Sequence, residues 1–246
     1  MRPMKSFAAL MFLVACGGGG GSGSTPDGAK SADAHIFLDA PPVVPQMIKF
    51  TGVTKESMQS SDVPLAGVTV AVYSVTNEAT PLGMATSDAS GAYTLMVPTN
   101  GSVVDGYLKA TKSGYTDNYV FPAAPFQGDQ LMANANLITT SNFGLLSFLV
   151  GQTAGHGLIV AEILDASEAS VMGATVASTP ASSTYRYSDS GGTPTSTSST
   201  NTDGASFMVN VPVGHVDISA TKSGMVFKTH GLVAHADAFT TTVITQ

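Results

Sequence analysis

The sequence predicts an all-β fold in which two tandem β-sandwiches are joined by a short helix and follow a signal peptide and a disordered tether. Three observations predict it. Charged residues make up only 11% of the 246 residues, while 26 Gly and 13 Pro supply many turns. Apolar residues alternate with polar ones in several short segments, as expected of strands with one buried face. One stretch of the chain is also repeated, which indicates two copies of one domain.

The same composition excludes several classes of protein. The formal net charge is −7, and no run of Lys or Arg could neutralise phosphates, so nucleic acid is not an expected partner. A single Cys excludes a disulfide-stabilised scaffold.

The alternation and the turns place individual strands. Two segments show the period of two most clearly: Val68, Val70 and Val72 in one, and Phe207, Val209 and Val211 in the other. Gly91 and Gly204 stand just before such strands, where a tight turn between antiparallel strands requires a positive φ. Several short strands with such turns predict a sandwich.

The repeat is visible in two matching stretches. Leu65-Ala-Gly-Val-Thr-Val-Ala71 is echoed by Val171-Met-Gly-Ala-Thr-Val-Ala177. Each copy closes with the identical pentapeptide Ala-Thr-Lys-Ser-Gly, at residues 110–114 and 220–224. The second copy carries an additional polar insert, residues 178–201, which we expect to extend a loop or an edge.

These motifs resemble the carboxypeptidase regulatory-like domain, a sandwich similar in topology to transthyretin and to immunoglobulin-like folds. The resemblance rests on Gly67-Val-Thr-Val70, on Asp88-Ala-Ser-Gly-Ala-Tyr-Thr-Leu-Met-Val-Pro98 and on Ala110-Thr-Lys-Ser-Gly-Tyr115. It covers residues 47–122, and more weakly 157–245. It implies an accessory or adhesin-like module of the cell envelope with no catalytic residues of its own.

The first residues predict export and lipidation. Arg2 and Lys5 precede the apolar run 7–14, which is too short to cross a bilayer and fits a signal peptide. Leu13-Val-Ala15-Cys16 resembles the lipobox of bacterial lipoproteins, which implies cleavage between Ala15 and Cys16 and acylation of Cys16. Because Gly17 is not the Asp that retains such proteins at the inner membrane, the resemblance implies the outer membrane in a Gram-negative host.

Five segments follow from these observations. Residues 1–15 are the signal peptide, 16–46 a flexible Gly/Ser/Pro-rich tether, 47–138 the first sandwich, 139–156 a linker with a short helix, and 157–246 the second sandwich. In the linker, Ser141 is the expected N-cap and Gly151 the expected end of the helix. One apolar face is formed by Phe143, Leu146, Leu149 and Val150. We expect this helix to pack between the sandwiches, with insertion into a membrane or binding of a partner as the alternative.

The residues offer little catalytic chemistry. No Gly-x-Ser-x-Gly, His-x-His or His-Glu-x-x-His motif occurs around the Ser residues or the five His. His230 and His235, five residues apart, would point to opposite faces of a regular strand. Glu162, Asp165 and Glu168 fit an exposed strand end and turn. We therefore predict no enzyme, no catalytic residue, no metal site and no cofactor.

The function that these patterns favour is that of a non-enzymatic, lipid-anchored protein of the cell envelope. Its sandwiches would serve adhesion, scaffolding or surface structure, with an envelope protein or a glycan as partner. A first alternative is a glycan-binding module that stacks sugars on exposed Tyr107, Tyr115 and Tyr119. A second is an accessory subunit of an envelope hydrolase or oxygenase, which would need His and carboxylate groups that converge.

Overall fold

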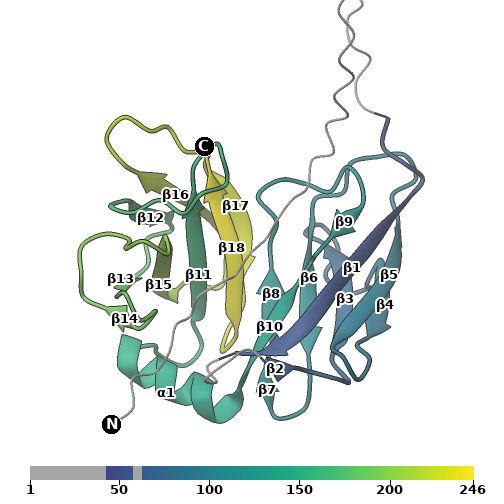
Figure 1. Cartoon of the computed structure of the whole chain (residues 1–246), viewed down its shortest axis with the longest axis horizontal. Helices are drawn as coiled ribbons and strands as arrows, with labels where there is room; N and C mark the ends of the chain where they lie inside the picture. Colours follow the sequence, from purple (N-terminus) through teal and green to yellow (C-terminus); the bar gives the residue numbers. More distant parts are fainter. Residues whose placement is uncertain (1–42, 58–62) are drawn as a thin grey trace, which may run out of the picture.

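The computed structural model describes residues 43–57 and 63–246, and within them it is all-β with one short helix (Figure 1). The predicted fold class is confirmed. The signal peptide, Cys16 and most of the tether lie outside the described residues. The tether was predicted to run to Gln46, but Val44 is buried and the Thr99 hydroxyl donates a hydrogen bond to the carbonyl of Pro45. These last residues therefore belong to the first sandwich.

The first sandwich consists of two sheets around one core. Its first sheet contains β1 (Met47–Glu56), β2 (Val63–Pro64), β5 (Ala92–Pro98), β7 (Tyr115–Thr116), β9 (Gln130–Leu131) and β10 (Ala135–Thr139). Its second contains β3 (Thr69–Ser74), β4 (Gly83–Thr86), β6 (Gly106–Thr111) and β8 (Asn118–Val120). The alternation predicted this packing: Val68, Val70 and Val72 are fully buried in the core.

The second sandwich repeats the plan. One sheet contains β11 (Gly157–Leu164), β13 (Thr184–Ser188), β14 (Pro194–Thr195), β15 (Ala205–Val211) and β18 (Phe239–Thr245). The other contains β12 (Thr175–Thr179), β16 (Gly214–Thr221) and β17 (His230–Ala234). The pairings correspond strand by strand: β1 is antiparallel to β5 and parallel to β10, and β11 is antiparallel to β15 and parallel to β18.

The repeat extends to single hydrogen bonds. The hydroxyl of Ser87 accepts from the Val68 N–H at 3.0 Å and donates to the Leu65 carbonyl at 2.8 Å. In the second sandwich, the hydroxyl of Thr200 accepts from the Ala174 N–H at 2.9 Å and donates to the Val171 carbonyl at 2.6 Å. Both hydroxyls are buried, so these bonds satisfy backbone groups that water cannot reach.

The glycine turns also agree between the copies. Gly91 has φ +77° and Gly204 has φ +63°, as their places before β5 and β15 predict. A side chain at Gly91 would lie 2.5 Å from the carbonyl oxygen of Thr54, and one at Gly204 would lie 2.8 Å from that of Ile163. Glycine is therefore required at these turns both by the backbone angle and by close packing.

The polar insert supplies an edge of the second sandwich. It contains β13 and β14, which lie at the end of one sheet. The hydroxyls of Tyr187 and Tyr185 accept hydrogen bonds from the backbone N–H groups of Val176 and Ser178, at 3.0 and 3.2 Å. These tyrosines thus satisfy two backbone donors of β12, and Tyr187 is itself buried.

The two sandwiches share one sheet. β18 lies between β11 and β8 and pairs in parallel with both, which gives the strand order β14-β13-β15-β11-β18-β8-β6-β3-β4 (Figure 1). Asn118 in β8 is fully buried at this junction. Its Nδ2 donates to the carbonyl of Asn136 at 2.9 Å, and its Oδ1 accepts from the Thr241 hydroxyl at 3.2 Å. The sandwiches therefore form a single body.

Helix α1 (Thr140–Val150) closes the lower end of the molecule in Figure 1. Its N-cap is Thr139, whose hydroxyl accepts from the Asn142 N–H at 3.2 Å, and not the predicted Ser141. Leu146 and Val150 are buried against a small core that includes residues of β11, β15 and β18. The predicted place of Leu149 on the buried face is wrong, because apolar residues lie on more than one side of the helix and only the stripe of Leu146 and Val150 is covered.

A second stripe of the same helix faces solvent. Leu145 is 48% exposed, Phe148 82% and Leu149 49%. Within residues 43–57 and 63–246, no helix has the length and hydropathy needed to cross a membrane.

Candidate functional site at the seam between the sandwiches

The most elaborate side-chain arrangement lies where the sandwiches meet, a region that we call the seam. Its centre is Tyr107 of β6, which is 2% exposed. The ring centroid of Tyr107 lies 4.8 Å from that of Phe121, 5.7 Å from Tyr119 and 5.8 Å from both Tyr73 and His235. Stacked and tilted rings at these distances contribute beyond the area that they bury.

The seam overturns the expected exposure of two tyrosines. Tyr107 and Tyr119 were candidates for an exposed sugar-stacking face, yet both are buried. Tyr107 does point away from the core of its own sandwich, opposite to Leu108, but the second sandwich covers that face. Burial also raises the pKa of the Tyr107 hydroxyl above its ordinary value.

The third candidate, Tyr115, lies elsewhere. It packs against the core of the first sandwich and donates a hydrogen bond to Glu56 Oε2 at 2.6 Å, a bond that raises the pKa of its hydroxyl. Lys112 Nζ lies 5.9 Å from the centre of its ring. The three tyrosines therefore do not share one exposed face, and the arrangement does not favour stacking of a glycan on them.

His235, from the second sandwich, contacts Tyr119 and Glu78 of the first. Its ring stacks on Tyr119 with centroids 3.6 Å apart, and its Nε2 lies 3.4 Å from Oε1 of Glu78 in the first sandwich. Burial lowers the pKa of His235, and Lys109 lowers it further, while Glu78 opposes them. Lys109 Nζ itself lies 2.9 Å from Asp117 and 4.9 Å from the centre of the Tyr119 ring.

This burial predicts a pH dependence of stability. A histidine whose pKa in the folded protein is below the ordinary 6.5 binds a proton more readily when unfolded. Stability from His235 is therefore complete above pH 6.5 and is lost as the pH falls from that value towards the lowered pKa. We expect His235→Phe, which keeps a stacked ring, to show a smaller fall in melting temperature between pH 7.5 and 5 than the unmodified protein. Thermal unfolding monitored by circular dichroism measures this. Parallel curves for the two proteins would contradict the assignment.

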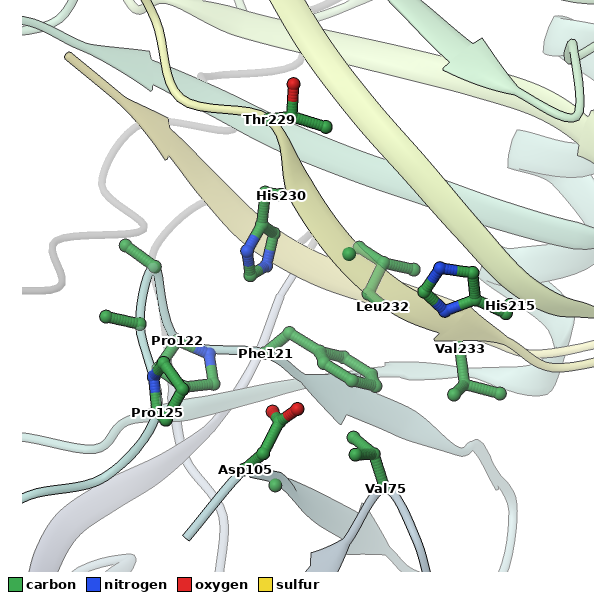
Figure 2. Close-up of a pocket in the computed structure, with 14 residues that line it drawn as sticks. Val75, Asp105, Phe121, Pro122, Pro125, His215, Thr229, His230, Leu232 and Val233 are labelled. Carbon is green, nitrogen blue, oxygen red and sulfur yellow. The ribbon is translucent and has the colours of Figure 1, made fainter. Parts of the chain in front are cut away.

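A pocket of about 330 Å³ opens beside the seam (Figure 2). Asp105, which precedes β6, and Val75, which follows β3, come from the first sandwich, whereas His230 and Leu232 come from β17 of the second. Figure 2 shows the Asp105 carboxylate and the His230 imidazole pointing toward one another across the pocket, with Phe121 beside them. Burial lowers the pKa of His230, and the charge of Asp105 opposes this only in part.

A larger cavity, of about 570 Å³, also borders the segment 121–125. This segment lines both cavities. Phe50, Leu108 and Val120 of the first sandwich and Leu164 and Val243 of the second also line the larger one. Both cavities therefore depend on how the two sandwiches are joined.

The remaining histidines and carboxylates are dispersed. Within the part of the chain that the structure describes, no three His, Cys, Asp or Glu residues are arranged to hold a metal ion. His230 lines the pocket, whereas His235 follows β17 and stacks on Tyr119. Asp165 accepts from the Ser167 N–H at 2.8 Å and from the Ala169 N–H at 3.0 Å, which is turn chemistry. Burial raises the pKa of Glu162.

Some residues of the seam could be identified from the sequence, but their contact with one another could not be predicted. Tyr107 of β6 and Tyr119 of β8 were predicted as exposed residues, and Phe121 directly follows β8. Their partner, His235, lies more than 110 residues further along the chain. Asp105 and His230 belong to no sequence motif. They lie in different sandwiches, which the pairing of β8 with β18 joins.

The fold and the seam define the chain as a duplicated β-sandwich protein with a shared central sheet. No protein-family model and no curated protein sequence matches it. Solved structures give weak similarities. The Bacillus anthracis TIE protein is 13% identical, with a TM-score of 0.26, over 80% of this chain and 34% of that one.

Two pilins give similar values. The shaft pilin SpaA of Lactobacillus rhamnosus GG is 10% identical, with a TM-score of 0.26, over 81% of this chain and 97% of that one. GBS52, the minor pilin of Streptococcus agalactiae, is 10% identical, with a TM-score of 0.27, over 80% and 94%. TM-scores this low carry no argument about function, which must rest on the chain itself.

Proposed function

We propose that this chain is a non-enzymatic, lipid-anchored protein of the cell envelope that displays two fused β-sandwiches for adhesion, scaffolding or surface structure. The observation that carries the proposal is the shared nine-stranded sheet. Parallel pairing on both sides of β18 and the aromatic seam make the tandem modules one body, which suits a protein whose task is to present a surface at a fixed geometry.

The anchor in this proposal is Cys16. The lipobox-like Leu13-Val-Ala15-Cys16 precedes a Gly/Ser/Pro-rich segment that reaches the sandwich at Val44. Each acyl CH₂ that is buried in a bilayer contributes about 0.8 kcal/mol, so two or more chains anchor a protein stably. The outer membrane of a Gram-negative cell is the location we propose.

The repeated modules resemble the carboxypeptidase regulatory-like domain in sequence, and we propose that relationship for both. Neither alternative function has an observation in its favour. A glycan platform needs exposed rings, but Tyr107 and Tyr119 are buried. An oxygenase subunit that holds a metal needs at least three His, Cys or carboxylate ligands together, and residues 43–57 and 63–246 contain no such group.

The anchor is tested by replacing Cys16. In cells fed an alkyne-bearing fatty acid, we expect the unmodified chain to incorporate label and to partition into the detergent phase. Cys16→Ala should lose nearly all of the label and remain in the aqueous phase, because alanine has no thiol to acylate. Protease treatment of whole cells, compared with lysed cells, then reports whether the body faces outward.

Ser24→Ala is the matched control, since it changes the same segment but leaves the lipobox intact. It should label like the unmodified protein. An unmodified thiol, found by mass spectrometry on a chain that still carries residues 1–15, would overturn the anchoring and the location together.

A further inference from the structure

The pocket beside the seam has an unbalanced charge. Of the residues that line it, only Asp105, His215 and His230 are ionisable, and no Lys or Arg is among them. The Nε2 of His230 is sealed from water and has no hydrogen-bond partner within the described residues. Burial lowers the pKa of His230 by more than the facing Asp105 charge raises it, so this imidazole stays neutral near pH 7. The Nε2 of His215 lies 3.3 Å from Oδ1 of Asp217, and His215 does not take part in the pair formed by Asp105 and His230. Asp105 therefore gives the pocket its charge.

The other side chains that line the pocket are apolar except for Thr229. Phe121 supplies an aromatic ring, and Pro122 and Pro125 supply walls whose backbone φ angles are fixed. Val75, Leu232 and Val233 complete the lining. A volume of about 330 Å³ is at the lower end of the range for small-molecule sites, which occur preferentially at domain interfaces.

We propose that this pocket binds a small organic ammonium ion, with the ammonium group against the Asp105 carboxylate and an apolar body against Pro122, Pro125 and Val233. Asp105 is exposed, and a carboxylate favours a cation that donates hydrogen bonds to it. Phe121 is 3% exposed and its ring stacks on Tyr107, so it supports this apolar wall from behind. An anion would meet the Asp105 charge with no Lys or Arg to offset it. This inference is independent of whether Cys16 is acylated.

The test uses the full chain and three probes of similar shape. These are 2-phenylethylammonium, neutral 2-phenylethanol and anionic 3-phenylpropionate, titrated at pH 7.5 with binding followed by calorimetry and by NMR chemical shifts. We expect the ammonium to bind with a saturable isotherm at millimolar or lower concentration and the anion not to bind. Asp105→Asn should weaken ammonium binding severalfold, because it removes the charge that the ammonium faces.

Two further variants make the result decisive. Asp117→Asn removes a carboxylate outside the pocket and should leave binding unchanged. Val75→Phe fills the pocket and should abolish binding while the circular dichroism spectrum stays native. The proposal is overturned if the ammonium fails to saturate, if phenylpropionate binds as well as the ammonium, or if Asp105→Asn and Asp117→Asn have equal effects.

Discussion

Tyr107→Ala is expected to lower the free energy of unfolding by about 3–5 kcal/mol, the range observed when a buried aromatic residue is truncated. Tyr107 is 2% exposed, and its ring contacts rings from both sandwiches, including Phe121 and His235. The cavity left behind would lie in the seam, so the coupling of the two sandwiches should weaken as well. Urea denaturation followed by circular dichroism should then show two transitions in place of one.

Tyr115→Ala is the matched control, because Tyr115 is half-buried in the first sandwich and does not contact the seam. It should cost less than half as much and leave a single transition. The chain has no Trp, so the near-ultraviolet circular dichroism of its Tyr residues reports the stacking directly. A variant Tyr107→Ala that unfolds in one transition with an unchanged near-ultraviolet spectrum would show that the seam does not couple the modules.

Gly91→Ala is expected to cost about 2–5 kcal/mol. Two effects add. A residue with a side chain at φ +77° costs about 1–2 kcal/mol. The new Cβ would also lie 2.5 Å from the carbonyl oxygen of Thr54, whose own N–H donates to the Gly91 carbonyl at 2.8 Å, so the strand β1 must shift. Chemical denaturation measures the loss.

Gly114→Ala separates the two effects. Gly114 has φ +84°, but nothing lies within 4 Å of a Cβ placed there, so only the backbone cost of about 1–2 kcal/mol applies. Equal losses at the two positions would show that the close approach of Thr54 contributes nothing.

The local structure was predictable from the sequence because it depends on near neighbours. Alternation identified the buried face of β3, and the turn residues identified the positive φ of Gly91 and Gly204. In β15 the predicted face was wrong: Phe207 and Val209 pack in the small core beside α1, whereas Met208 and Val211 pack in the main core of the second sandwich, because the strand bulges near Asn210, which has φ +57°. The duplicated hydrogen bonds of Ser87 and Thr200 agree with the sequence repeat. Each of these features needs only residues within one module.

Features that join the modules were not predictable in this way. Lys109 and Tyr107 alternate with buried Leu108 as an exposed face would, and no local signal shows that β17 and β18 cover it. The pairing of β8 with β18 joins residues about 120 positions apart through backbone groups, which all side chains share. The same limit applies to α1, whose apolar residues lie on more than one side of the helix and so do not show which stripe is covered.

The position of β18 in the middle of the shared sheet has a consequence for assembly. This strand comes from residues 239–245, yet both of its neighbours depend on it to complete their backbone pairing. During synthesis, the aromatic surface around Tyr107 is not covered until β17 and β18 follow, more than 120 positions later, and closure of such distant contacts is intrinsically slow. Nascent chains would therefore pass through a long-lived intermediate that exposes this apolar surface. We expect them to need chaperones most just before β18 is synthesised.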